Sequence, residues 1–299
     1  TGASGYIAWN LIKKLVHFDC TIICFSRSDQ KIEKQKGNAN FQFIESSYQN
    51  EFSFQKAVKN SDIIFHLASQ TSVYEAEEDP LADYEANVRP MQLLLEACRK
   101  SGNYPIIVFS GTSTQCGMSK ELPVDENVID EPITTYDFHK LQAERWLKYY
   151  TGQGWVKGVS LRLTNVYGPG QDMNNLRQGM VSIYLAQALK NKKILIKGSL
   201  ERVRDFIYID DVVECWFRAS KSNSCLNLCM NIGTGIPTKV KRLISIIRKK
   251  IPGTKYYLSR PTKGDQNFIV GDNNLFRSKL NIKKFLSVEE GLELFISSL

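Results

Sequence analysis

The chain begins with Thr1-Gly2-Ala3-Ser4-Gly5-Tyr6-Ile7-Ala8, a glycine-rich turn that leads into a helical pattern running to His17. Glycines at this spacing let a backbone turn tightly and approach a phosphate at the amino end of a helix. Ala8 stands where a third glycine is commoner, but its methyl group is small enough for a helix to pack closely on a strand. We therefore expect the backbone of Gly2, Ser4, Gly5, Tyr6 and Ile7 to bind the pyrophosphate of a dinucleotide.

Short β-branched runs follow this turn and alternate with helical patterns. The runs lie at 21–25, 41–44, 62–66, 106–109 and 159–163, and the helices are expected near 6–17, 53–59, 80–101 and 134–150. Strands that alternate with helices are typical of parallel sheets with right-handed crossovers. The sequence thus predicts an α/β fold with a doubly wound parallel sheet of the Rossmann type.

After Gly168-Pro169-Gly170 the pattern becomes less regular, which indicates a smaller C-terminal lobe. Helices are expected near 178–190, 210–220 and 238–251, with a short strand at 194–196. We expect a dinucleotide-binding domain over 1–168 and mainly a substrate-binding lobe over 169–299, with segments near 205–233 returning to the first domain. Because the glycine-rich turn normally follows a strand, we also expect the first strand of the sheet to be missing from this sequence.

The composition is that of an ordinary globular protein, with 42% hydrophobic and 23% charged residues. No segment approaches the ~20 consecutive apolar residues of a membrane span, and no signal segment opens the chain, so we expect a cytoplasmic protein without membrane contact.

Seven cysteines and three scattered histidines suggest free thiols and no metal site. The net charge of +8 favours anionic partners. The basic run at 239–250 contains no aromatic residue, so no nucleic-acid partner is expected.

The end of the second expected strand bears on the choice of nicotinamide cofactor. A carboxylate there binds the ribose 2′-hydroxyl of NAD and repels the 2′-phosphate of NADP. This chain has Cys24-Phe25-Ser26-Arg27 instead, and the hydroxyl of Ser26 and the guanidinium of Arg27 suit a phosphate. A solvated surface arginine is the alternative. NADP is therefore favoured and NAD stays possible.

Tyr136 and Lys140 are four residues apart in a helical pattern and so share one helix face. A neighbouring cation lowers the pKa of a phenol from its usual ~10, which suits proton exchange with a hydroxyl. The spacing alone is common. However, the strand at 106–109 runs into Ser110-Gly111-Thr112, and hydroxyls at the carboxyl end of a parallel strand lie where ligands bind. We expect Thr112 to hold the reacting oxygen.

Several further motifs occur in order along the chain. They are Asp62-Ile63-Ile64-Phe65-His66-Leu67-Ala68, Asn87-Val88, Arg162-Leu163-Thr164-Asn165-Val166-Tyr167-Gly168-Pro169, Arg204-Asp205-Phe206-Ile207-Tyr208-Ile209-Asp210-Asp211, Asn231-Ile232-Gly233-Thr234-Gly235, and Arg260-Pro261 with Gly264-Asp265. With the glycine-rich turn and the Tyr136/Lys140 pair, the sequence resembles the extended short-chain dehydrogenase/reductase family, in particular its NAD-dependent nucleotide-sugar epimerases, dehydratases and reductases. The resemblance covers nearly the whole chain.

The resemblance implies a role for each matching residue. Tyr136 would be the acid/base, Lys140 would hold the nicotinamide ribose, and Thr112 would fill the catalytic Ser/Thr position. Leu67, Ala68 and Asn87 would join the cofactor site. Asn165, Arg204 and Arg260 would contact the diphosphate and nucleoside of the substrate, which suits charge-assisted hydrogen bonding. The alternatives are an Arg204–Asp205 ion pair and a turn cap for Asn165. Helices at 85–100 and 134–150 resemble those that form a homodimer contact in this family.

The chain also departs from the family pattern. Ser46-Ser47-Tyr48 replaces an acidic residue at the adenine, and Ser113-Thr114 replaces the Asp-Glu pair of sugar dehydratases, so dehydration is not expected. Cys116 is either a reactive thiol or a small apolar filler. A 4-epimerase and a 4-ketosugar reductase, each acting by hydride transfer at sugar C4, both stay open. An apolar-alcohol dehydrogenase of steroid or flavonoid type and a non-catalytic dinucleotide sensor are the alternatives.

Overall fold

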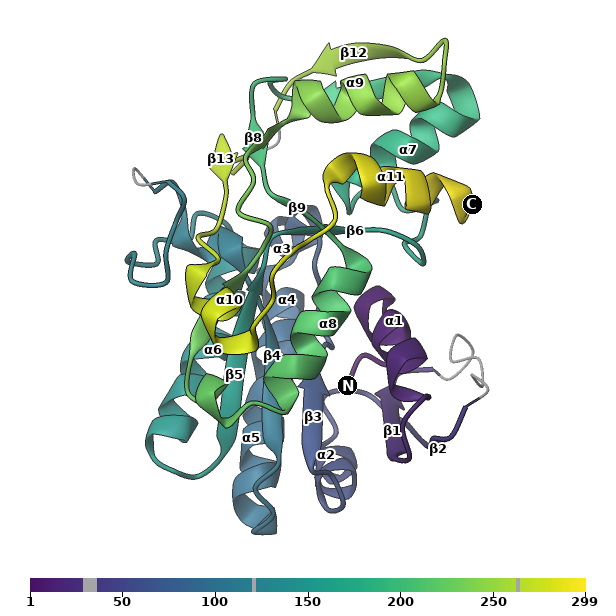
Figure 1. The fold of residues 1–299 in the computed structure, drawn as a ribbon. Coiled ribbons are helices and arrows are strands. Elements are labelled where there is room, and N and C mark those ends of the chain that lie inside the picture. Colours follow the sequence, from purple (N-terminus) through teal and green to yellow (C-terminus); the bar gives the residue numbers. More distant parts are fainter. Residues whose placement is uncertain (29–36, 120–121, 262–263) are drawn as a thin grey trace. The chain divides into compact units, whose positions relative to one another are not determined.

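The computed structural model describes residues 1–28, 37–119, 122–261 and 264–299 (Figure 1). Its contacts divide the chain into two compact units. The first unit comprises Thr1–Thr112, Thr134–Arg162 and Val213–Met230, and the second comprises Ser113–Ile133, Leu163–Val212 and Asn231–Leu299. Among the described elements, α8 (Ile209–Ser220) and β10 (Cys229–Ile232) have residues in both units, and the last residue of β5 (Lys157–Leu163) belongs to the second unit.

The first unit is built from alternating strands and helices, as predicted. Its elements are α1 (Tyr6–Leu15), β1 (Thr21–Ser26), β2 (Asn40–Glu45), α2 (Glu51–Val58), β3 (Ile63–His66), α3 (Val73–Glu78), α4 (Pro80–Asn87), α5 (Arg89–Ser101), β4 (Ile106–Thr112), α6 (Thr135–Gly152) and β5 (Lys157–Leu163). β1 pairs with β2 and β3 pairs with β4, both in parallel register. A four-stranded sheet has the order β10-β5-β4-β3, and in Figure 1 α5 and α6 run alongside it. The predicted parallel α/β fold is confirmed.

The helix expected over 80–101 is two helices in the structure. α4 begins at Pro80 behind Asp79, whose side chain accepts a hydrogen bond of 2.9 Å from the amide of Ala82. A break follows at Val88, because Pro90 has no amide hydrogen to continue the ladder and is tolerated only in the first turn of α5. α5 then ends at Gly102 in a left-handed conformation, with φ of 67°.

The core of the first unit lies between α2, α5 and α6 and the inner strands. β4 is buried at nearly every position, as expected for a parallel strand covered on both faces. Large side chains that are almost fully buried fill this core: Phe25, Phe54, Met91, Leu94, Leu95 and Phe109. Their packing fixes the carboxyl ends of β3 and β4, from which several site residues project.

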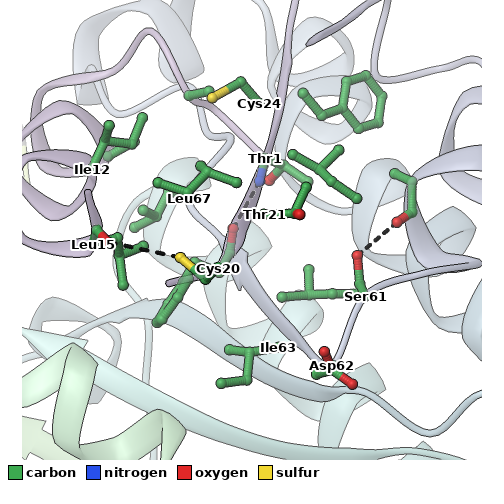
Figure 2. A pocket seen from close by; sticks show the side chains of 18 of the residues that line it. Thr1, Ile12, Leu15, Cys20, Thr21, Cys24, Ser61, Asp62, Ile63 and Leu67 are labelled. Atoms are coloured by element: carbon green, nitrogen blue, oxygen red, sulfur yellow. Dashed lines mark hydrogen bonds between the residues drawn. The ribbon is translucent and has the colours of Figure 1, made fainter. Parts of the chain in front are cut away.

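An apolar slot separates the β1–β2 pair from the sheet that contains β3. The two sheets share no pairing in the described part of the chain, and a cavity of about 460 Å³ lies between their facing edges. Figure 2 shows its lining, with Ile12 and Leu15 from α1, Cys24 from β1 and Ile63 from β3. Its lining includes the acidic residues Asp19 and Asp62, but most of the lining side chains are apolar, so the slot has the chemistry of a core rather than of a polar ligand site.

The second unit consists of small sheets and amphipathic helices. Its elements are a 3₁₀ turn (Ser113–Cys116), β6 (Asn165–Tyr167), α7 (Met180–Asn191), β7 (Lys193–Lys197), β8 (Val203–Arg204), β9 (Phe206–Tyr208), β11 (Thr238–Lys239), α9 (Val240–Lys250), β12 (Lys255–Ser259), β13 (Phe268–Ile269), α10 (Asn274–Leu280) and α11 (Val288–Ser297). β8 pairs with β13 in parallel and with β11 in antiparallel register. β7 pairs with β12, and β6 with β9. α9 buries Val240, Leu243, Ile244 and Ile247, so its basic residues form the outer face.

Candidate active site

The glycine-rich turn rests against the carboxyl end of β3. Gly2 has φ of +70°, and a Cβ atom there would stand 2.6 Å from the backbone nitrogen of Ala68, so only glycine fits. The hydroxyl of Thr1 accepts a hydrogen bond of 3.2 Å from the same Ala68 nitrogen and lies 3.0 Å from His66 Nδ1. These contacts place the predicted cofactor residues Leu67 and Ala68 directly beside the turn.

α1 begins immediately after this turn and presents its amino end. Gly5 is the N-cap residue in extended conformation, and the first turn of α1 contains no acidic residue. The amides of Tyr6 and Ile7 belong to this end of the helix, where amide hydrogens and the helix dipole favour an anion, and Ser4 lies in the turn just before it. The site thus fits a dinucleotide pyrophosphate, because the backbone can approach closely where Gly2 and Gly5 lack side chains.

Tyr48 reaches the turn from a position that sequence reasoning did not assign to the site. Its hydroxyl accepts a hydrogen bond of 3.1 Å from the amide of Gly2 and lies 3.5 Å from the carbonyl of Phe25. Tyr48 stands in the segment where the family's acidic residue is missing. Its contact follows from the folding of β2 and α2 against the turn, and no local motif signals it.

Ser26 is the last residue of β1 and Arg27 follows it, and these two residues are expected to discriminate between NAD and NADP. Ser26 is buried and its hydroxyl donates to the carbonyl of Ser28, whereas Arg27 is exposed. The hydroxyl of Ser26 is therefore already engaged within the turn, and Arg27 is the side chain available to an anionic ligand.

Thr112 and Tyr136 are brought together from the end of β4 and the first turn of α6. Thr134 caps α6, because its hydroxyl accepts a 3.2 Å hydrogen bond from the amide of Asp137. This cap fixes Tyr136 in the first turn, where its phenol is hydrogen-bonded to the side chain of Thr112. Thr112 itself is buried. The fold thus brings together the side chains of Thr112 and Tyr136, the two residues predicted to contact the reacting oxygen.

The pKa of Tyr136 differs from the expectation drawn from its spacing to Lys140. Burial raises the pKa of the phenol above its ordinary value, and the nearby carboxylates of Asp137 and Asp83 raise it further. The hydrogen bond with Thr112 acts in the opposite direction but does not outweigh burial. The phenol is therefore held protonated as a hydrogen-bond donor, because desolvation disfavours the phenolate.

Lys140 is buried beside β4 and the segment that follows β3. Its ammonium nitrogen lies 3.4 Å from Ser69 Oγ and 4.5 Å from the centre of the Phe109 ring. Burial lowers the pKa of Lys140 to about 7, against the opposing effect of the carboxylates of Asp83 and Glu144. A buried amine with a pKa near neutrality can change its charge when an anionic ligand arrives.

A hydrogen-bond network connects Lys140 to α4. Ser69 Oγ lies 2.6 Å from Asn87 Oδ1, and Asn87 Nδ2 donates to Asp83 Oδ1 at 2.9 Å. The other oxygen of Asp83 lies 2.7 Å from Nδ1 of His139, one residue before Lys140. Asn87, predicted as a cofactor residue, is therefore a buried link between Lys140 and Asp83. The spacing of Asp83 and Asn87 on one helix face was the local signal that could have pointed to Asp83.

Behind α6, a buried ion pair fixes the helix against β5. Arg162 Nη2 lies 2.5 Å from Glu144 Oε1, and Ser160 Oγ donates to Glu144 Oε2 at 2.6 Å. Gly111 faces this cluster, and a Cβ atom there would come within 2.9 Å of Ser160 Oγ. The arrangement explains why glycine stands between Ser110 and Thr112 and why α6 holds one position along β4.

The second unit contains the three residues expected at the substrate. Arg204 is buried and its Nη2 lies 2.7 Å from Asp265 Oδ1. The alternative of an ion pair with neighbouring Asp205 is wrong, because Asp205 instead accepts hydrogen bonds from Thr234 and Gly235 at the turn after β10. Burial raises the pKa of Asp205 to about 6 despite these hydrogen bonds.

Asn165 and Arg260 lie at different places in the second unit. The backbone amide and Nδ2 of Asn165 both contact the carbonyl of Asp205, at 3.0 and 3.3 Å, so Asn165 links β6 to β9. This is not the turn cap before Gly168 that was the alternative. Arg260 is exposed, directly after β12. Cys116 is buried, and its thiol donates to the carbonyl of Ser113, as expected of a filler.

No helix in the four described ranges is long and apolar enough to cross a membrane. Within those ranges, no three His, Cys, Asp or Glu side chains gather as they would around a metal ion.

Comparison with known proteins defines the class of this chain. The model of the NAD-dependent epimerase/dehydratase family matches residues 1–233. The chain is 30% identical to a putative UDP-glucose 4-epimerase of Methanocaldococcus jannaschii, over 95% of this chain and 89% of that protein. It is 26% identical to the dTDP-4-dehydro-6-deoxyglucose reductase of Escherichia coli, over 100% and 96%. It superposes with a TM-score of 0.91 on the UDP-glucose 4-epimerase of Thermotoga maritima, at 30% identity and covering 99% and 96% of the two chains.

The chain belongs to the NAD-dependent epimerase/dehydratase family. It is an enzyme of the NAD-dependent nucleotide-sugar epimerase or reductase class, which confirms the family and the activity class predicted from its motifs.

Proposed function

We propose that this enzyme acts at C4 of a nucleoside-diphosphate hexose, with a UDP-sugar as the first candidate substrate. The observation that carries the proposal is the hydrogen bond between Thr112 and Tyr136, with the buried Lys140 one helical turn further along α6. The M. jannaschii and T. maritima relatives, both named as UDP-glucose 4-epimerases, support C4 as the reacting carbon.

In this mechanism the chain's own residues position the sugar hydroxyl and manage its proton. Once ionised, the Oη of Tyr136 takes the proton of the C4 hydroxyl when the sugar is oxidised, and the phenol formed in this way returns that proton when the ketone is reduced. Thr112 holds the same sugar oxygen, and Lys140 stabilises the transient phenolate. When bound, the nicotinamide accepts and returns the hydride. Tyr136 must first lose its own proton to solvent, so its raised pKa has to fall when the ligands bind. We propose that charged Lys140, one helical turn further along α6, lowers it.

We infer that the favoured product is the 4-epimer, with reduction of a 4-ketosugar as the second candidate. Epimerisation needs rotation of the keto sugar between two hydride transfers, so the cofactor stays bound. The E. coli relative, named as a reductase, favours the second candidate, and so does Arg27. Arg27 is exposed directly after β1, the segment Cys24-Phe25-Ser26-Arg27 contains no carboxylate, and the guanidinium would suit the 2′-phosphate of NADP.

We also propose that the enzyme is a homodimer through α5 and α6. The exposed aromatic side chains of Phe138 and Tyr149 lie on α6 and support this contact. Light scattering on a size-exclusion column, with the parent and Tyr149→Lys compared, tests the proposal. A parent that elutes as a monomer at micromolar concentration would refute it.

A thermal-shift panel with NAD, NADP, UDP, GDP, CDP and dTDP tests the function first, because a selective ligand raises the melting temperature by mass action. We expect stabilisation by one dinucleotide and one nucleoside diphosphate. Tyr136→Phe should bind both ligands as the parent does and lose turnover of UDP-glucose by about 100-fold or more. Cofactor binding without a response to any nucleoside diphosphate would instead favour an apolar-alcohol dehydrogenase. Retained turnover in Tyr136→Phe would exclude the proposed proton transfer.

A further inference from the structure

Two buried arginines of the second unit share one carboxylate. Arg202 Nη1 lies 2.5 Å from Asp265 Oδ2, and Arg204 Nη2 lies 2.7 Å from Asp265 Oδ1. The side chains of Arg202 and Arg204 are only 6% and 4% exposed. Because they are two residues apart in an extended segment, they point to the same side of the chain. The cluster therefore holds two positive charges against one negative charge.

The guanidinium of Arg202 has one nitrogen that this cluster does not use. Its Nε donates to the carbonyl of Ser199 at 3.0 Å, and the Arg202 side chain is also hydrogen-bonded to the phenol of Tyr184. Its Nη2 is buried and has no hydrogen-bond partner within the described ranges. Buried donors of a charged group rarely stay unpaired, since desolvating them without a partner is costly.

The surroundings hold this guanidinium in place. Gly198 has φ of +85°, and a Cβ atom there would stand 3.0 Å from Asp265 Oδ2 and 3.3 Å from Arg202 Cζ. The backbone before Arg202 thus lies tightly over the ion pair. Burial lowers the pKa of Arg204 to about 10, and the charge of Arg202 contributes to this shift, as expected where positive charge is in excess. An incoming anion would meet a rigid site with a spare donor and surplus positive charge.

We propose that Arg202 is a second phosphate-binding arginine, whose Nη2 donates to an oxygen of the substrate's diphosphate beside Arg204. The proposal rests on the nucleoside-diphosphate sugar proposed above and assigns to it a contact that the family motif does not supply, since the motif includes only Arg204. Asp265 would then orient both guanidinium groups, and its single negative charge would leave the pair of arginines with a net positive charge.

The test measures binding of UDP and of inorganic pyrophosphate by calorimetry, with NAD and NADP measured alongside. The variants are Arg202→Met, Arg202→Lys and the control Arg242→Met, which removes an exposed arginine paired with Glu289 at 2.9 Å. We expect Arg202→Met to bind UDP and pyrophosphate about 10- to 100-fold more weakly, the effect of one hydrogen bond between charged groups. The affinity of Arg202→Met for NAD and NADP should stay within about twofold of the parent's. If Arg202 instead contacted the phosphates of the dinucleotide, the variant would bind NAD and NADP more weakly.

Arg202→Lys separates a phosphate contact from a purely structural role. Lysine keeps a positive charge beside Asp265, but its single nitrogen cannot hold Asp265 and a phosphate at two separate points. Weakened UDP binding in the lysine variant supports the proposal, and full recovery of parent affinity overturns it. A folded Arg202→Met with unchanged UDP affinity also overturns it. If the parent binds NADP but neither UDP nor pyrophosphate, the proposed function itself fails, and this contact fails with it.

Discussion

The ammonium nitrogen of Lys140 lies 3.4 Å from Ser69 Oγ in a buried site, and the nearest carboxylates do not restore the ordinary pKa of the amine. This relationship couples the stability of the first unit to pH. It also means that the charge of Lys140, which the mechanism needs, depends on what else occupies the site.

Lys140 should make the protein more stable as pH rises from about 7. The folded state has a pKa of about 7 at Lys140, whereas the unfolded chain keeps the value of 10.5. Between these values the unfolded chain binds a proton that the folded chain does not, so the free energy of unfolding rises with pH. Tyr136 does not oppose this below pH 10, because its phenol stays protonated in both states.

Urea unfolding at pH 7, 8 and 9 measures this dependence. Lys140→Met lacks the titrating group and should show a smaller rise in unfolding free energy than the parent over this range. Equal slopes for the two proteins would show that the burial of Lys140 does not shift its pKa.

Asp83→Asn should destabilise the protein by about 1–3 kcal/mol, because it leaves buried donors facing an amide nitrogen. The carboxylate of Asp83 accepts from Gln70 Nε2 and Asn87 Nδ2, both at 2.9 Å, and lies 2.7 Å from His139 Nδ1. Asp79→Asn is the matched control, since asparagine caps a helix as well as aspartate and should change stability by less than about 0.5 kcal/mol. A similar loss in both variants would argue against the network.

Gly2→Ala should weaken dinucleotide binding by about 10-fold or more, since the added methyl forces the turn away from Ala68. Gly102→Ala is a control of nearly equal geometry. Both glycines have positive φ, +70° and +67°, but a Cβ atom at Gly102 meets nothing within 4 Å. Gly102→Ala should therefore lower the free energy of unfolding by only the ~1 kcal/mol that a left-handed conformation costs alanine. Its affinity for the dinucleotide should equal that of the parent. Equal affinities of the two variants for NADP would contradict this role for Gly2.

Local features of the sequence were sufficient to predict much of this protein. The glycine-rich turn, the alternation of strands and helices and the four-residue spacing of Tyr136 and Lys140 depend on neighbours within one or two turns, so their pattern can be read directly. The break before α5 was missed, although its cause is equally local, because Pro90 has no amide hydrogen and is tolerated only in the first turn of a helix. The parallel sheet and the family followed from these elements taken in order.

Tertiary structure alone decided which side chains meet and what burial does to them. Arg204 pairs with Asp265, 61 residues away, rather than with adjacent Asp205, and Tyr48 reaches Gly2 across 46 residues. The pKa of Tyr136 rises although a lysine follows four residues later, because desolvation depends on the whole packed environment. Spacing along the chain can suggest which two residues interact. Their distance in space and the exclusion of water decide the strength, and even the sign, of that interaction.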